Sequence, residues 1–220
     1  MPRCATSHPW LVRAVFSLPD FDRRLRTRLD PLEAVSTAHP RRGDNDLNPD
    51  WDEPIAPPRE AAVLGPIIKR PGGWTMLLTE RSHELVMHSG QVAFPGGRVD
   101  ATDASPLHAA LRETEEEVGL AMSFIEPVGA WDRYLTITGY HVTPIAALVE
   151  PGFSLTLAPG EVASVFEAPL DFLMNPANHE KREAEFRGRR RYYYAMPYEG
   201  HFIWGATAGM IRALYERLYE

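Results

Sequence analysis

The chain has 220 residues, 44% of them hydrophobic and 24% charged, which is ordinary for a soluble globular protein with one sizeable core. Its formal net charge of −7 argues against a general nucleic-acid binder, because such proteins normally present a basic face. An anionic small-molecule substrate stays compatible with this charge, since a bound divalent cation reverses the local sign of a site.

Cysteine content and hydropathy indicate the cellular compartment to expect. Cys4 is the single cysteine and cannot form an internal disulfide, so the sequence implies no oxidising compartment. No apolar run approaches the ~20 residues that cross a bilayer, and the N-terminus lacks the apolar stretch of a secretory signal. We therefore expect a cytoplasmic protein that engages neither membranes nor nucleic acid.

The first 60 residues divide into two parts of different composition. Residues 1–35 carry apolar side chains at helical spacing, among them Trp10, Leu11 and Ala14, and are interpreted as a helical N-terminal extension. Residues 36–60 are rich in Pro, Asp and Asn and are interpreted as a linker. The sequence leaves open whether the extension packs on the main domain or joins two copies into a homodimer.

Residues 61–220 are expected to form one domain of the α/β class. Apolar runs bounded by turn residues predict strands at 61–69, 74–79, 128–131, 140–149 and 191–196. Longer periodic segments predict helices at 105–118 and 202–218. Strands before, between and after two helices predict a mixed β-sheet flanked by helices.

The helix predicted at 105–118 breaks a local rule at its carboxyl end. Four glutamates, at 113 and 115–117, face the negative end of the helix dipole, where cations are preferred. At about 100° per residue, Glu113, Glu116 and Glu117 share one side of the helix, away from its apolar stripe. Hard divalent cations prefer such oxygen ligands, and the alternative interpretation is a solvated acidic face.

A glycine-containing loop runs into this helix and favours the first interpretation. Residues 94–100 read Phe-Pro-Gly-Gly-Arg-Val-Asp, and the adjacent glycines allow close approach of the backbone to a site. The helix then ends in Arg-Glu-Thr-Glu-Glu-Glu-Val-Gly at 112–119. Neither segment is specific alone, but the two at this separation form a strong pattern.

Together the two segments resemble the Nudix box, in which a Gly and an acidic residue precede R-E-U-x-E-E-x-G-U. The matching residues are Gly97, Asp103, Arg112, Glu113, Glu116, Glu117, Gly119 and Leu120. Asp103 stands where Glu is usual, and eight residues rather than seven separate it from Arg112. The resemblance covers about residues 61–218 and implies an α/β/α sandwich with a mixed β-sheet, here preceded by a short helical extension.

The same resemblance implies a pyrophosphohydrolase that uses Mg²⁺ or Mn²⁺. The implied metal ligands are Glu113, Glu116, Glu117 and the Gly97 carbonyl. Glu116 is also implied as a catalytic residue, and Arg112 as the group that orients the carboxylates. A general base outside the box is often needed, and Glu161 resembles a recurrent acidic position after the later strands.

A second motif precedes the box and narrows the substrate. Residues 77–97 contain Leu-Leu-Thr-x-Arg-Ser, His-x-Gly-Gln and Phe-Pro-Gly-Gly, which resembles the extended signature of coenzyme A pyrophosphatases. The residues implied in substrate binding are Arg81, Ser82, His88, Gln91, Gly96, Gly97 and Arg98. The implied reaction cleaves coenzyme A or acyl-CoA into 4′-phosphopantetheine, or its acyl form, and adenosine 3′,5′-bisphosphate.

Two other functions stay open. One is hydrolysis of another nucleoside diphosphate derivative, such as ADP-ribose or NADH. The other is a non-catalytic, nucleotide-sensing scaffold on the same fold. A degenerate scaffold should lose acids from the helix, and this chain keeps Glu113, Glu116 and Glu117. The sequence does not decide between Mg²⁺ and Mn²⁺, nor does it give the preferred acyl chain.

Overall fold

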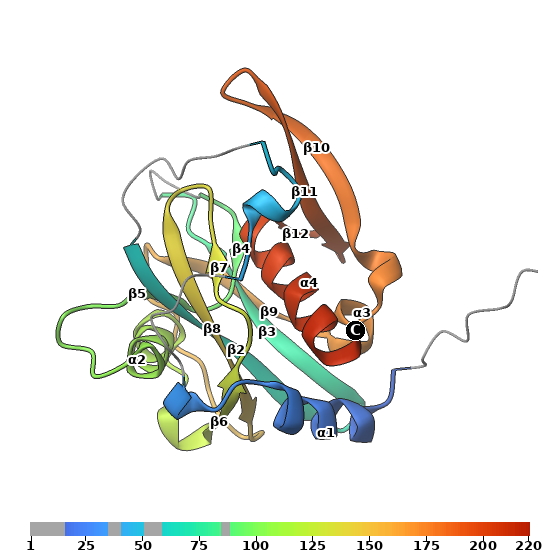
Figure 1. Cartoon of the computed structure of the whole chain (residues 1–220). Coiled ribbons are helices and arrows are strands. Elements are labelled where there is room, and N and C mark those ends of the chain that lie inside the picture. The colour runs from blue at the N-terminus through green and yellow to red at the C-terminus, as the bar shows by residue number, and fades with distance from the viewer. Residues whose placement is uncertain (1–15, 35–40, 51–58, 85–88) are drawn as a thin grey trace, which may run out of the picture.

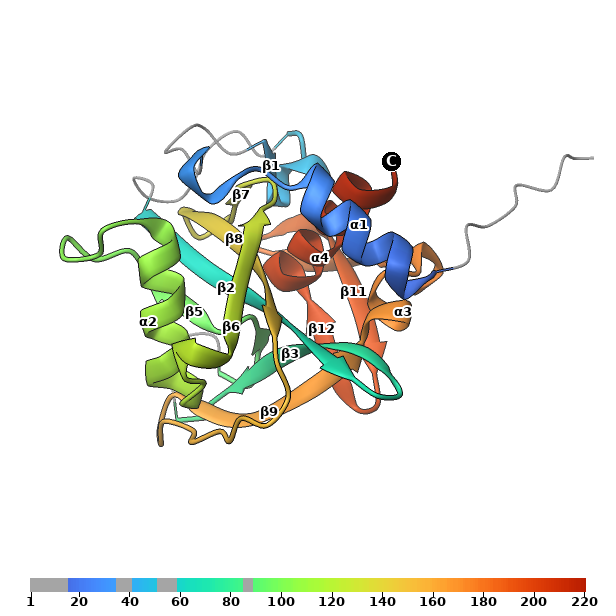
Figure 2. The ribbon, with the colours of Figure 1, turned by 90° about the horizontal axis from the view of Figure 1, so that it is seen from below.

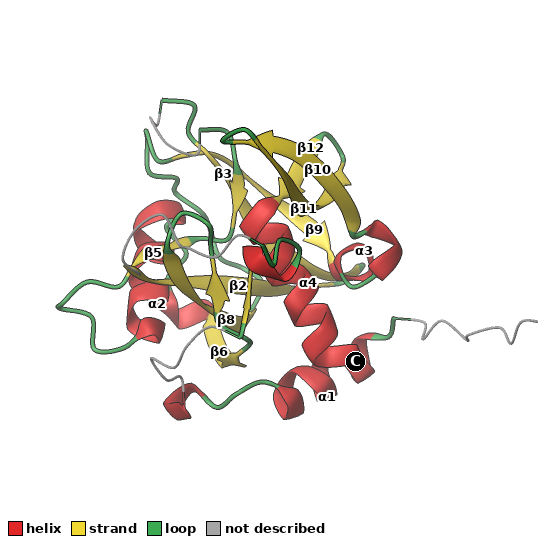
Figure 3. Ribbon diagram, turned by 45° about the horizontal axis from the view of Figure 1, so that its top comes forward, coloured by secondary structure: helices red, strands yellow, loops and turns green. Residues whose placement is uncertain are grey.

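The computed structural model describes residues 16–34, 41–50, 59–84 and 89–220. Within these ranges the chain forms a nine-stranded mixed sheet and a three-stranded antiparallel sheet, with helices packed around them (Figure 1). The second sheet lies on the far side of the molecule from helix α2 (Pro106–Val118), as Figure 3 shows.

The larger sheet is built around two long parallel strands. β2 (Arg59–Arg70) runs beside β8 (Tyr140–Val149), from Arg59 opposite Tyr140 to Ile68 opposite Val149. The other strands of this sheet are β1 (Arg42–Gly43), β3 (Gly73–Arg81), β4 (Val92–Ala93), β5 (Gly96–Arg98), β6 (Ile125–Ala130), β7 (Tyr134–Leu135) and β9 (Val162–Pro169). β2 and β3, which cover the strands predicted at 61–69 and 74–79, pair as an antiparallel hairpin.

The smaller sheet and the helices complete the fold. The sheet consists of β10 (Glu180–Phe186), β11 (Arg189–Tyr198) and β12 (His201–Trp204). The other α-helices are α1 (Leu18–Arg28), α3 (Leu170–Leu173) and α4 (Gly205–Tyr219). Short 3-10 helices are η1 (Leu32–Ala34), η2 (Asp44–Asp46), η3 (Met122–Phe124) and η4 (Pro176–Asn178). No helix of the described residues is long and apolar enough to span a bilayer.

The two faces of the larger sheet are covered by different helices. Ala62 and Leu64 of β2 point to one face and pack in a cluster with Ala109 of α2. Ile67 lies an odd number of residues away, so its side chain points to the other face, where Leu214 of α4 belongs to the same cluster. This arrangement confirms the predicted sandwich of a mixed sheet between helices.

The helix at 105–118 is confirmed, and the closing helix begins later than predicted. Ser105 caps α2 by accepting a hydrogen bond from the His108 amide, and Gly119 ends it in the left-handed region at φ 69°. Residues 202–204, assigned to the closing helix, instead form most of β12, because they pair with β11. The helix itself starts at Gly205.

The described part of the N-terminal extension packs on the main domain. Phe21 and Leu25 of α1 are fully buried in the cluster that includes α4. Arg24 Nη1 donates to the Leu218 carbonyl at 2.8 Å, and α1 lies beside α4 in Figure 2. Trp10, Leu11 and Ala14 lie outside the described residues.

Part of the segment interpreted as a linker is integrated into the body of the protein. The Asp44 side chain is 7% exposed and pairs with Arg191 at 2.8 Å. It also accepts hydrogen bonds from the Tyr134 hydroxyl at 3.1 Å and the Ile137 amide at 2.8 Å. Residues 41–50 therefore attach through polar contacts, which their composition does not reveal.

Candidate functional site

The glycine loop and α2 meet at the edge of the larger sheet. β5 pairs with β2, which places Gly97 opposite Ala62. A Cβ added to Gly97 would lie 2.5 Å from the Glu113 carboxyl carbon, so the glycine lets the backbone lie directly against that carboxylate. Gly96 adopts φ +147°, where a side chain would collide with the Ala62 carbonyl oxygen.

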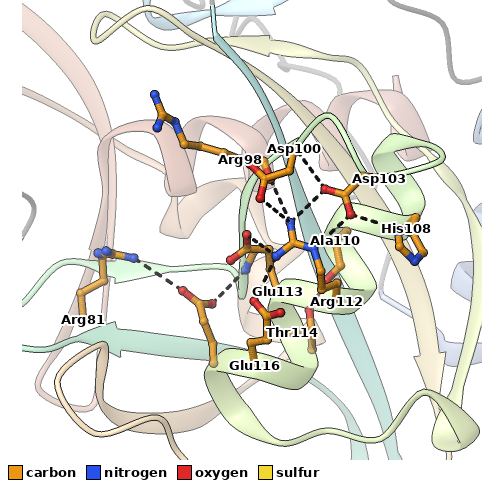
Figure 4. Close-up of polar contacts among 12 residues, drawn as sticks. Arg81, Arg98, Asp100, Asp103, His108, Ala110, Arg112, Glu113, Thr114 and Glu116 are labelled. Carbon is orange, nitrogen blue, oxygen red and sulfur yellow. Dashed lines mark hydrogen bonds and ion pairs between the residues drawn. The ribbon is translucent and has the colours of Figure 1, made fainter.

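Arg112 holds the acidic side of α2 together (Figure 4). Its Nε and Nη2 donate to the two carboxylate oxygens of Asp103 at 3.0 and 2.9 Å. Its Nη1 donates to Glu113 at 2.8 Å and to Glu116 at 3.0 Å. Bidentate contacts of this kind fix a guanidinium in both position and plane. Arg112 therefore contacts two of the three box glutamates, and its role in orienting them for a metal ion stays a prediction.

Asp103 is the anchor of this arrangement despite the longer spacer. Its side chain is fully buried, accepts the Asp100 amide at 2.9 Å and contacts His108 Nδ1 at 2.9 Å. The Arg112 guanidinium holds the pKa of Asp103 well below its usual range. Since Asp103 is thus an ionised acceptor, His108 Nδ1 carries the proton and donates it.

Glu117 lies in a different environment from the other two box glutamates. It is 4% exposed, and its Oε2 accepts the Gly96 amide at 3.0 Å. Its Oε1 lies 3.6 Å from Arg81 Nη1. Burial raises the pKa of Glu117 to about 7, because the Gly96 amide and the Arg81 charge offset only part of the desolvation. Burial also raises the pKa of Glu113, whereas the Glu116 side chain is 59% exposed.

The carboxylates of Glu113, Glu117 and Glu161 suit a divalent cation by their charge and their oxygen donors, although they do not converge on one point. Among the described residues, no three His, Cys, Asp or Glu side chains are grouped closely enough to hold a metal ion. Glu113 and Glu161 nevertheless lie near enough for their charges to raise the pKa of Glu117. A cation among these three groups would relieve their repulsion and the burial cost of Glu117, and oxygen donors suit Mg²⁺ or Mn²⁺.

Comparison with known proteins identifies the family that this box belongs to. The NUDIX domain family model matches residues 58–190. The uncharacterised Nudix hydrolase NudL of Escherichia coli K12 is 44% identical over 156 residues, covering 71% of this chain and 81% of that protein. NudL of Shigella boydii serotype 18 matches to the same extent. The chain belongs to the Nudix hydrolase family.

Solved structures of this family resemble the chain more distantly. The NUDIX domain of Shewanella oneidensis NrtR, crystallised with ADP-ribose, is 16% identical with a TM-score of 0.47, covering 74% of this chain and 90% of that one. A Caenorhabditis elegans Ap4A hydrolase is 21% identical with a TM-score of 0.42, covering 51% of this chain and 81% of that one.

The motif upstream of the box forms backbone hydrogen bonds with itself at the end of β3. The Arg81 amide donates to the Gln91 carbonyl at 3.0 Å, and the Arg81 carbonyl accepts the Gly90 amide at 3.1 Å. Ser82 is 7% exposed, and its hydroxyl accepts the Glu84 amide at 3.2 Å. The structure therefore shows backbone positioning by Gln91 and a turn-capping hydroxyl at Ser82, and their substrate contacts stay predictions.

The remaining predicted site residues are Glu161, Arg98 and His88. Glu161 is exposed, and its carbonyl accepts the Ser82 amide at 2.8 Å, which ties the end of β3 to the start of β9. The exposed Arg98 side chain points away from Arg112 in Figure 4. His88 lies outside the described residues.

His108 contributes to the site but was not predicted from the sequence. His108 binds the anchor Asp103, yet nothing in the box pattern marks it. Its only signal is position, because the third residue of a helix lies beside the loop that precedes the helix.

Proposed function

We propose that this Nudix hydrolase is a coenzyme A pyrophosphatase. It would cleave the diphosphate of coenzyme A or acyl-CoA to 4′-phosphopantetheine, or its acyl form, and adenosine 3′,5′-bisphosphate. The observation that carries the proposal is the meeting of two motifs. Arg81, the arginine of Leu-Leu-Thr-x-Arg-Ser, lies 3.6 Å from Glu117 of the box. The substrate signature and the acids thus converge on one place.

The residues around this place suit a diphosphate. Arg81 is available for phosphate oxygens, to which a guanidinium can donate two parallel hydrogen bonds, and the exposed Arg98 is a second candidate. Arg112 holds the carboxylates of Glu113 and Glu116 together on one side of α2.

The acids divide the remaining work. Glu113, Glu116 and Glu117, with the Gly97 carbonyl, would hold the divalent cation. Bound Mg²⁺ or Mn²⁺ neutralises a diphosphate and makes water a stronger acid. The exposed Glu161, whose charge acts on Glu117, would accept the proton of the water that attacks phosphorus. The bridging P–O bond then breaks, and the leaving phosphate departs as an anion.

Product analysis tests the proposal. The full chain is incubated with coenzyme A and Mg²⁺ or Mn²⁺, beside parallel reactions with ADP-ribose and NADH. We expect metal-dependent release of 4′-phosphopantetheine and adenosine 3′,5′-bisphosphate, abolished by Glu117→Gln and retained by Arg182→Gln on the distant strand β10.

Each alternative function predicts a different result in the same assay. Turnover of ADP-ribose or NADH without coenzyme A would show that the upstream signature reports another nucleoside diphosphate substrate. Metal binding with no turnover of any of the three would favour a sensing scaffold.

A further inference from the structure

Arg81 is fixed at its backbone and loosely held at its guanidinium. Both its amide and its carbonyl are hydrogen-bonded within the loop that β3 enters, to Gln91 and Gly90. The side chain is 31% exposed, and its head reaches toward α2 in Figure 4. The starting point of the side chain is therefore set, while its end has access to solvent and to a ligand.

The contact between Arg81 and Glu117 differs from the other arginine contact at the site. Arg81 Nη1 approaches Glu117 at 3.6 Å, beyond the usual range of a charge-assisted hydrogen bond. Its buried Nε has no hydrogen-bond partner among the described residues. Arg112, by contrast, binds Asp103 through two hydrogen bonds of 2.9 and 3.0 Å. The Arg81–Glu117 contact is therefore longer and has fewer hydrogen bonds than the Arg112–Asp103 pair.

Glu117 needs a positive charge that Arg81 supplies only in part. The carboxylate is almost fully buried and receives one backbone amide, from Gly96. A monovalent guanidinium at 3.6 Å offsets less of the desolvation than a divalent ion in direct contact would. Where both cations compete for one carboxylate, binding of the stronger one releases the weaker.

We propose that Arg81 stands in for the divalent cation on Glu117 in the metal-free protein and transfers to a phosphate oxygen of the substrate when that cation binds. Binding of the cation to Glu117 would then also free Arg81 to bind a phosphate. The second half of this inference rests on the proposed diphosphate substrate, whereas the first half concerns metal binding alone.

The first half is tested by titrating the full chain with Mn²⁺ in the absence of substrate, with free Mn²⁺ measured by electron paramagnetic resonance. Removing the competing charge in Arg81→Gln should tighten Mn²⁺ binding on the order of tenfold. Arg81→Lys keeps the charge and should bind Mn²⁺ within about twofold of wild type. Arg182→Gln removes a charge from the exposed strand β10 and controls for net charge, with no change expected.

The second half is tested by calorimetry with inorganic pyrophosphate as the probe on Mn²⁺-saturated protein. Arg81→Gln and Arg81→Lys should both bind the probe on the order of tenfold more weakly, because neither side chain can donate bidentate hydrogen bonds to phosphate as a guanidinium does. Unchanged or weaker Mn²⁺ binding by Arg81→Gln, in protein whose unfolding midpoint matches wild type, would overturn the competition. Tighter Mn²⁺ binding with unaltered pyrophosphate binding would overturn the transfer.

These readouts separate the inference from the proposed substrate. Failure of coenzyme A turnover leaves the Mn²⁺ and pyrophosphate measurements fully interpretable. Conversely, coenzyme A turnover with an unaltered Mn²⁺ affinity in Arg81→Gln supports the proposed function and contradicts the role of Arg81.

Discussion

Replacing Glu117 by Gln should stabilise the metal-free protein at neutral and alkaline pH, although it removes an acid of the site. The fold raises the pKa of Glu117 from 4.5 to about 7, mainly through burial. At 1.36 kcal/mol per pH unit, ionising Glu117 in the folded state costs about 3 kcal/mol more than ionising it in the unfolded chain. Gln is similar in size and keeps a carbonyl oxygen for the Gly96 amide.

The direction follows from proton linkage. Between pH 4.5 and 7 the folded protein holds a proton on Glu117 that the unfolded chain has lost, so its stability falls as pH rises through this window. Gln does not ionise and escapes this loss. The unfolding free energy of the variant minus that of wild type should therefore grow through the window and level off above it, at up to about 3 kcal/mol.

Urea unfolding in a metal chelator measures this difference at several pH values from 4.5 to 8. Glu116→Gln is the matched control, because its side chain is 59% exposed and its replacement should change stability by less than about 0.5 kcal/mol at every pH. A pH-independent difference for Glu117→Gln would refute the reasoning, since it would mean that the folded state does not oppose ionisation. Added Mn²⁺ should stabilise wild type and leave the variant nearly unchanged.

Further substitutions at Asp103, His108 and Gly97 test the geometry around Arg112 and Glu113. Asp103→Asn keeps the shape but removes the charge that anchors Arg112, so metal-dependent kcat/KM should fall on the order of tenfold or more in a turnover assay. His108→Leu should also lower kcat/KM, because Leu has no hydrogen-bond donor for Asp103. His108→Asn should restore kcat/KM, because its side-chain amide keeps a donor toward Asp103. Gly97→Ala should lower the unfolding free energy by about 1–3 kcal/mol in urea titration, because its Cβ would displace the Glu113 carboxylate.

Much of the site was predictable because its chemistry is local in sequence. A carboxylate cluster on one helix needs only the helical period and a defined beginning and end. Ser105 and Gly119 supply those ends in the structure. The contact of Arg112 with Glu116 joins residues four apart, which are neighbours on a helix, whereas spacing alone does not predict its contact with the adjacent Glu113.

The features that were missed depend on contacts between distant segments. Residues 202–204 have apolar spacing that suits a helix, and only their pairing with β11 makes them a strand. Residues 41–50 attach through a buried carboxylate, Asp44, whose partner Arg191 is far away in the chain. Hydrophobic patterning carries no information about such a polar attachment.

The electrostatic design of α2 links metal binding to stability. The helix has no basic residue in its last turn, yet it carries Glu113, Glu116 and Glu117 toward its carboxyl end, and Glu117 is buried. Arg112 compensates the two outer carboxylates with good hydrogen bonds, whereas Arg81 serves the buried one at 3.6 Å. The incompletely compensated charge is thus that of Glu117, where binding of a cation would relieve the largest desolvation cost. A cation that binds only the folded protein stabilises it by RT ln(1 + [M]/Kd). Under the proposed ligand set, the acid that destabilises the metal-free fold would therefore make the metal-bound fold the favoured one.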